Sequence, residues 1–230
     1  MTDSPITATE VAPQAPAHAQ TTPVGKTRKN RFSEVQPVLE KLFELYPHLF
    51  GKRFLPLKLG VFQELLEAHP DVFDRQSLKA ALGVHARSTP YLQSVASGTS
   101  RHDLQGKVVE AVSPEHVYFA AVELFHRRQA RKGISAEEAQ SNHQRLRAQL
   151  IAAFDASGLS KQDYLALLPA SDEIITAVLE EALSQAELDR ARREALQRSY
   201  EVSGMTLQAF ADSLGMDPRT VQAALHVAAN

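Results

Sequence analysis

Residues 88–117, STPYLQSVASGTSRHDLQGKVVEAVSPEHV, decide the fold class of this chain. The run Ser88-Thr89-Pro90 predicts a helix start, because a hydroxyl side chain can cap the helix and proline is tolerated in the first turn. Residues 101–112 then break the helical period, and a Gln-Gly turn at 105–106 between short extended segments predicts a β-hairpin. A Ser-Pro pair at 113–114 opens another helix, so helices flank one small hairpin and the fold class is α+β.

Toward the N-terminus the sequence predicts three further helices and an arm. Apolar residues recur at helical spacing from Ser33 to about Tyr46, and Pro37 is tolerable only in the first turn of that helix. A short helix follows residue 60, and Asp74 caps the next one. Residues 1–30 hold four prolines and no aromatic residue, which predicts a disordered arm that ends in a short basic run.

Toward the C-terminus the chain predicts only helices. Ser135 begins a capping box, and a long helix should start near Asp172 and run to about Val202. Residues 158–179 align without gaps on residues 204–225, and each copy has a capped short helix, a turn and a second helix. The expected C-terminal region, 135–230, is therefore all-α with a duplicated two-helix unit.

The charge is unevenly distributed along the chain. Residues 26–133 hold 17 Lys and Arg against 11 Asp and Glu, whereas residues 134–230 hold 8 against 14. Clustered cations favour a polyanionic partner, although two ordinary domains of different charge explain the split equally well. The absence of cysteine excludes disulfides, and no apolar run is long enough to span a membrane, so we expect a cytoplasmic protein.

Several spaced motifs resemble, in the same order, the ProQ/FinO domain over about residues 33–130. They are Pro56-Leu57-Lys58-x-Gly60-x-Phe62-x-x-Leu65, Leu82, Tyr91-Leu92, Gly98, Arg101-x-Asp103-Leu104-x-Gly106 and His116-Val117. The resemblance implies a mostly helical RNA-binding domain at 31–132 in a bacterial RNA chaperone. It also implies the partners, which are small RNAs and mRNAs whose hairpins carry single-stranded 3′ tails, and a role in post-transcriptional regulation.

The resemblance also implies which residues contact RNA. Lys58, Tyr91 and Arg101 match positions that line the RNA pocket of the family, and Arg75 and Lys79 match further cations in part. Gly83, His85 and Pro90 stand where other members often have basic or aromatic residues.

The residues themselves give a compatible picture. A helix start at Ser88 and Thr89, beside Arg87, should leave backbone N–H groups and a partial positive charge free for a phosphate or a terminal hydroxyl. Tyr91 could stack on a base there, or it could be a half-buried core ring. Asp103 could hold the Arg101 guanidinium for a phosphate, or the two could form an ordinary surface ion pair.

Two other functions remain open from the sequence. Residues 204–230 have the spacing of a helix-turn-helix and suggest a DNA-binding regulator, but they hold one cation, Arg219, against two anions. The C-terminal helices could instead bind a protein partner or self-associate, which would make the protein an adaptor. We find no motif for an enzyme, a metal site or a cofactor, and we expect none of the three.

Overall fold

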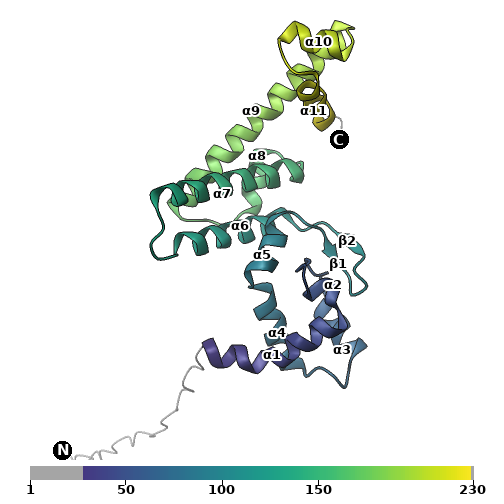
Figure 1. The fold of residues 1–230 in the computed structure, drawn as a ribbon, viewed down its shortest axis with the longest axis vertical. Helices are drawn as coiled ribbons and strands as arrows, with labels where there is room; N and C mark the ends of the chain where they lie inside the picture. Colours follow the sequence, from purple (N-terminus) through teal and green to yellow (C-terminus); the bar gives the residue numbers. More distant parts are fainter. Residues whose placement is uncertain (1–27, 229–230) are drawn as a thin grey trace, which may run out of the picture.

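The protein is described by a computed structural model over residues 28–228, with side chains from 35 to 225 (Figure 1). Residues 1–27 of the predicted disordered arm lie outside the described residues. The elements, in chain order, are α1 (Arg28–Leu45), α2 (Pro47–Phe50), α3 (Val61–Ala68), α4 (Arg75–Ala86), α5 (Thr89–Ala96), β1 (Arg101–His102), β2 (Val108–Glu110), α6 (Pro114–Gln129), α7 (Ala136–Ser157), α8 (Lys161–Leu167), α9 (Glu173–Ser203), α10 (Leu207–Leu214) and α11 (Pro218–Ala228). The predicted α+β class is confirmed, since the helices accompany one two-stranded antiparallel sheet.

The predicted helix starts are confirmed by their caps. The Asp74 carboxylate accepts the backbone N–H groups of Gln76 and Ser77 at the start of α4. The Ser88 hydroxyl accepts the N–H of Tyr91 at the start of α5, at 3.4 Å. These local hydrogen bonds replace the ones that the first turn of a helix cannot make internally.

The first helix differs from the expectation. It begins at Arg28 instead of near Ser33, and Pro37 therefore lies inside α1 and not in its first turn. Proline removes one backbone hydrogen bond from a helix interior, so local preference disfavours this arrangement. Packing opposes that preference, because α1 lies against α4 and buries Leu42 completely.

The hairpin is closed by its own turn and tied to a preceding loop. Gly106 has φ +78°, and a side chain there would also meet the His48 ring at 2.7 Å, so glycine is needed. His102 on β1 donates its N–H to the Pro56 carbonyl, and its own carbonyl accepts the Lys58 N–H, both at 2.8 Å. The segment 56–58 is thereby held alongside the hairpin.

The two predicted halves share a core. Helix α5 packs along α6, α6 against α7, and α7 against α9. One cluster of buried side chains extends from Leu42 on α1 to Ala186 on α9. The boundary that we placed between 132 and 135 therefore crosses a packed helix pair, and whether residues 31–132 fold alone stays a prediction.

The internal repeat is seen at equivalent buried positions. Tyr164 on α8 and Phe210 on α10 are 0% and 5% exposed, and Ile175 and Val221 on the following helices are both fully buried. The alignment also pairs Leu168 with Leu214 and predicts that both are buried, and this pair is wrong. Leu168 is partly buried, whereas Leu214 is 46% exposed because nothing in the described chain covers the end of α10.

The repeat also includes a third helix that the alignment missed. Phe154 on α7 meets the Tyr164 ring with centroids 5.2 Å apart, and Tyr200 on α9 meets Phe210 at the same distance. Both upstream residues precede their partners by the same number of positions. Each unit is therefore the end of a long helix, a short helix and a following helix. Helix α9 belongs to both units, and its far end carries α10 and α11 with a small separate core (Figure 1).

Among residues 28–228, none of the helices is both long and apolar enough to cross a membrane.

Candidate nucleic-acid interface

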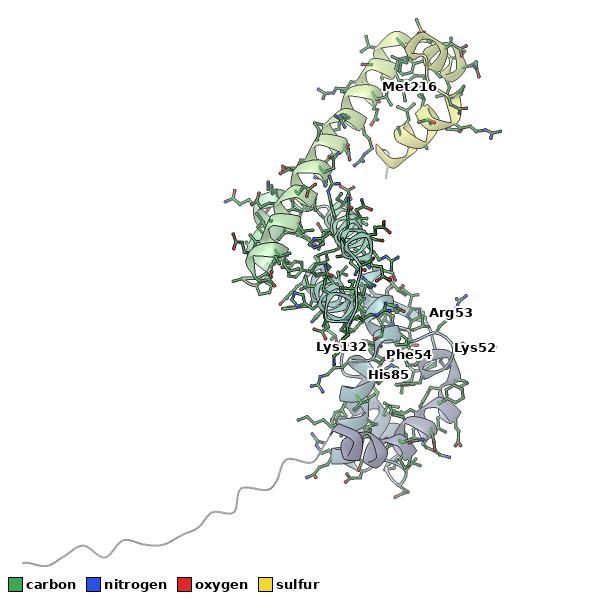
Figure 2. The ribbon with its side chains drawn as sticks, turned by 60° about the vertical axis from the view of Figure 1, so that its left-hand side comes forward. Lys52, Arg53, Phe54, His85, Lys132 and Met216 are labelled. Carbon is green, nitrogen blue, oxygen red and sulfur yellow. The ribbon has the colours of Figure 1, made fainter. Side chains whose placement is uncertain are left out.

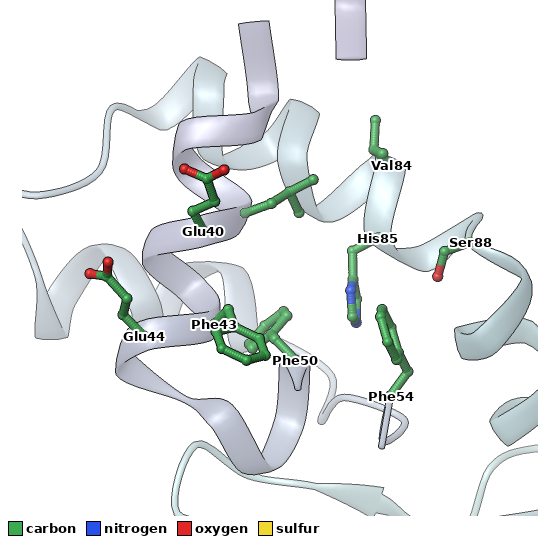
Figure 3. A pocket seen from close by; sticks show the side chains of 9 residues that line it. Glu40, Phe43, Glu44, Phe50, Phe54, Val84, His85 and Ser88 are labelled. Carbon is green, nitrogen blue, oxygen red and sulfur yellow. The ribbon is translucent and has the colours of Figure 1, made fainter. Parts of the chain in front are cut away.

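A cavity of about 640 Å³ opens between α1, α4 and the loop that follows α2 (Figure 3). Aromatic and aliphatic side chains form most of its wall, and Glu40, Glu44 and Ser88 are its polar groups. In Figure 3 Glu40 and Glu44 come from α1, on the opposite wall from Ser88, and the Glu44 side chain points away from Phe43 and His85. The rest of the lining is apolar, at Leu39, Phe43, Phe50, Phe54 and Val84, apart from the imidazole of His85. A concave, mostly apolar surface with a few polar groups is the usual form of a small-ligand site.

His85 separates the cavity from the core behind it. The side chain is 4% exposed, and its ring stacks on Phe54 with centroids 5.0 Å apart and an interplanar angle of 15°. Burial lowers the pKa of His85 from 6.5 to about 4, so the ring is neutral at neutral pH. Its buried Nε2 has no hydrogen-bond partner among the described residues. The part of the cavity wall that Phe54 and His85 form is therefore aromatic and uncharged.

Tyr91 lies directly behind His85. The two rings are 5.0 Å apart, and the Tyr91 hydroxyl accepts the backbone N–H of Leu57 at 3.2 Å. With 9% of its surface exposed, Tyr91 is a core ring and offers no open face for a base. The stacking role considered for it is therefore not supported, and its position is one of support for the cavity wall.

Arg101 also contacts Leu57, whose N–H the Tyr91 hydroxyl accepts. Its Nη1 donates to the Leu57 carbonyl at 2.9 Å, its Nη2 lies 3.1 Å from His116 Nδ1, and its Nε lies 3.7 Å from Glu110. The side chain is buried between these groups. The proposed pairing of Arg101 with Asp103 is wrong.

Asp103 has a structural task in the hairpin turn. Its carboxylate accepts the N–H groups of Gln105 and Lys107, at 3.0 and 2.9 Å. A carboxylate that caps two backbone donors closes the turn, and this explains why it does not reach the guanidinium.

Lys58 is partly exposed and directly follows Leu57, which Tyr91 and Arg101 both contact. Its ammonium pairs with Glu64, and this hydrogen bond and charge raise the pKa of Lys58. A phosphate would have to compete with that carboxylate.

The turn before α5 supplies fewer backbone donors than expected. Pro90 has no N–H, and Ser88 takes the N–H of Tyr91, so at most the N–H of Thr89 remains in that first turn. Arg127 of α6 reaches this point, where its Nη1 donates to the Arg87 carbonyl at 2.8 Å. Positive charge at the α5 turn therefore comes from side chains.

The other expected cations lie apart from the cavity lining. Arg75 and Lys79 are exposed on α4, and the Arg75 guanidinium lies over the Phe62 ring at 5.4 Å. Two cations that we did not predict are better placed, because Lys52 and Arg53 immediately precede Phe54 and are exposed (Figure 2).

The structure thus gathers part of the predicted set. Lys58, Tyr91 and Arg101 meet around Leu57, and Ser88 borders the cavity. Sequence reasoning missed the cavity itself. Phe43 gave a signal, since it belongs to an apolar stripe wider than one buried face requires. Within residues 28–228 no cluster of three His, Asp or Glu residues is placed to hold a metal.

Fold and site together define a mostly helical α+β domain that carries an aromatic cavity with exposed cations beside it. Residues 32–141 match the model of the ProQ/FINO family. Through these residues the chain belongs to the ProQ/FINO family, which confirms the resemblance seen in the sequence. A solved FinO-like RNA chaperone from Neisseria meningitidis MC58 matches at 31% identity with a TM-score of 0.35, over 38% of this chain and 90% of that one. No curated protein matches the chain.

Proposed function

We propose that this protein binds RNA as a cytoplasmic RNA chaperone, and that its cavity receives the free 3′ end of structured RNAs. Small RNAs and mRNAs that end in a hairpin and a short single-stranded tail are the proposed partners. Membership of the ProQ/FINO family and the positive excess of residues 26–133 support RNA as the partner class.

The observation that carries the proposal is the position of the cavity. It borders Ser88, at the helix start where the sequence led us to expect an RNA end. Phe43, which is 51% exposed, and Phe54, which is partly exposed, give the wall aromatic faces, and the buried His85 ring stacks on Phe54 and supports it. Unpaired bases bind proteins by stacking on such faces.

The polar groups of the cavity suit a hydroxyl end. Glu40 and Glu44 are both exposed carboxylates in the lining; Glu40 accepts from the Gln36 amide at 3.0 Å and Glu44 pairs with Lys41 at 2.9 Å. A carboxylate has two oxygens, so each can still accept a hydrogen bond from a 2′ or 3′ hydroxyl of a terminal ribose. The same negative charges repel a terminal phosphate. A cavity of this composition should therefore prefer a free 3′ hydroxyl.

Cations beside the cavity suit the phosphates that precede the end. Lys52, Arg53 and Arg87 are exposed and pair with no carboxylate in the described part of the chain. Phosphate contacts of this kind fix the register of a bound strand and supply much of its affinity.

The test is a binding titration with one terminator hairpin that carries a short uridine tail. Three versions end in a free hydroxyl, in a 3′ phosphate, or in further nucleotides beyond the tail. We expect the free hydroxyl to bind most tightly. Phe43→Ala should weaken that complex by about 1–3 kcal/mol, the usual worth of one stacked base. Phe119→Ala is the control, since Phe119 is 47% exposed on α6 and lies outside the cavity lining. Equal affinity for the three RNAs, or equal loss in the two variants, would refute the proposal.

We propose self-association through the unit formed by α10, α11 and the end of α9 as a second function. Val202, Met205, Leu214 and Met216 are apolar and 88%, 48%, 46% and 38% exposed there, and Figure 2 shows Met216 at the far end of the molecule. Their exposure contrasts with the first repeat unit, where Leu159 and Leu168, the counterparts of Met205 and Leu214, pack partly buried against the main core.

Sedimentation velocity tests this second function. The wild type should show a concentration-dependent dimer that the double variant Met205→Gln, Leu214→Gln lacks. A wild type that stays monomeric at high concentration would exclude it.

A further inference from the structure

Three cations lie at the end of α6 and just after it, at Arg128, Arg131 and Lys132, and a fourth, Arg145 in the middle of α7, is close enough to Arg128 to repel its charge. Arg131, Lys132 and Arg145 are exposed, and Arg128 is partly buried. None of these side chains forms an ion pair or a hydrogen bond with another described residue. By contrast Arg127, which directly precedes Arg128 on α6, has a carboxylate partner, because its Nε lies 2.8 Å from Glu123.

Arg128 is the unusual member of this group. Its Nη1 is buried without a hydrogen-bond partner in the described part of the chain. Burial and the nearby charge of Arg145 lower the pKa of Arg128, although a guanidinium stays protonated. Two guanidinium groups that repel each other, one of them with a buried unsatisfied donor, are both stabilised by an anion placed between or beside them.

The position of the group connects it with the proposed end site. Arg127 donates from Nη1 to the Arg87 carbonyl at 2.8 Å and to the Thr89 hydroxyl at 3.3 Å, both at the α5 turn. Consecutive helix residues point about 100° apart, so α6 directs Arg127 to α5 and Arg128 toward Arg145 on α7. Figure 2 shows Lys132 at the junction between the part that holds the cavity and these two helices.

We propose that Arg128, Arg131, Lys132 and Arg145 form a second RNA site, which binds the phosphate backbone that leads away from the 3′ end. This inference rests on the proposed function, because it takes the same RNA as the ligand. Arg145 lies beyond residues 32–141, so the site extends past the family match onto α7. The strand end would be read in the cavity, and the α6–α7 corner would add affinity without regard to sequence or end chemistry.

The experiment measures RNA affinity against salt concentration for the full chain and three charge-matched double variants. Arg128→Gln with Arg145→Gln removes two cations of the site. Arg192→Gln with Arg198→Gln removes two exposed cations from α9 and is the control. The variant Arg131→Gln with Lys132→Gln, at two exposed positions, repeats the test without touching a buried group. The RNA is the hairpin with a uridine tail, in its 3′-hydroxyl and 3′-phosphate forms.

We expect both site variants to bind about tenfold more weakly at moderate salt, and the slope of log affinity against log salt to fall by roughly 1 to 2. Both RNA forms should lose the same factor, so the preference for the 3′ hydroxyl persists. Unchanged affinity and slope in both site variants, or an equal change in the α9 control, would overturn this inference. A wild type without preference for the hydroxyl would instead overturn the cavity proposal, and the salt slopes would still decide the second site.

Discussion

Acid should destabilise this protein through His85. The folded state holds the imidazole neutral until the pH falls to about 4, whereas the unfolded chain protonates it below about 6.5. Between these values the unfolded state binds the extra proton, so stability is complete above about pH 6.5 and falls as the pH drops toward 4. The difference of about 2.5 units, at 1.36 kcal/mol per unit, corresponds to about 3 kcal/mol.

The assay is urea unfolding at pH 7.5 and pH 4.5 for the wild type and His85→Phe. Carboxylates also titrate in this range, so the informative quantity is the difference between the two proteins. Phenylalanine fits among the Phe50, Phe54 and Tyr91 rings and cannot be protonated. The wild type should lose about 2–3 kcal/mol more than the variant on acidification.

A surface histidine gives the matched control. His126 is exposed and pairs with Asp172, so His126→Gln should keep the acid sensitivity of the wild type. If His85→Phe loses as much stability as the wild type, His85 is not buried as the structure shows, and the aromatic wall of the cavity is wrong.

Three further predictions concern single contacts. Phe210→Ala should cost the terminal unit about 3–5 kcal/mol and expose α10 and α11 to hydrogen exchange, whereas Leu214→Ala should cost less than about 1; equal effects would contradict the second core. Tyr91→Phe removes a hydroxyl that accepts a buried N–H, so urea unfolding should show a loss of about 1–3 kcal/mol, and no loss would exclude that hydrogen bond. Glu40→Gln with Glu44→Gln should bring the affinities for 3′-phosphate and 3′-hydroxyl RNA closer together, and an unchanged ratio would place the RNA end elsewhere.

Local signals in the sequence predicted the elements well. Asp74, Ser88 and Ser135 cap their helices as expected, because a cap depends on residues within one turn. The start of α1 could not be predicted in the same way, since the packing of α1 on α4 outweighs the local effect of Pro37. The repeat was visible from its short helices. The long helix that begins the second unit could not be separated, because the same helix, α9, also ends the first unit without a break.

The site was predicted less completely than the fold. The resemblance implied that Lys58, Tyr91 and Arg101 lie together, and they do meet at one backbone segment. Their burial and their partners depend on residues distant in sequence, so the closed positions of Tyr91 and Arg101 could not be foreseen. The cavity is likewise lined by Phe43 and His85, which lie on separate helices. No local sequence pattern predicts that these two residues line the same cavity.

The most direct measurement is photocrosslinking of the last nucleotide. A hairpin RNA with 4-thiouridine at its 3′-terminal position is bound, irradiated and digested, and the crosslinked peptides are identified by mass spectrometry. We expect crosslinks to the cavity lining, at Phe43 and Phe54. Crosslinks confined to α10 and α11, or spread evenly over exposed cations, would contradict the cavity proposal.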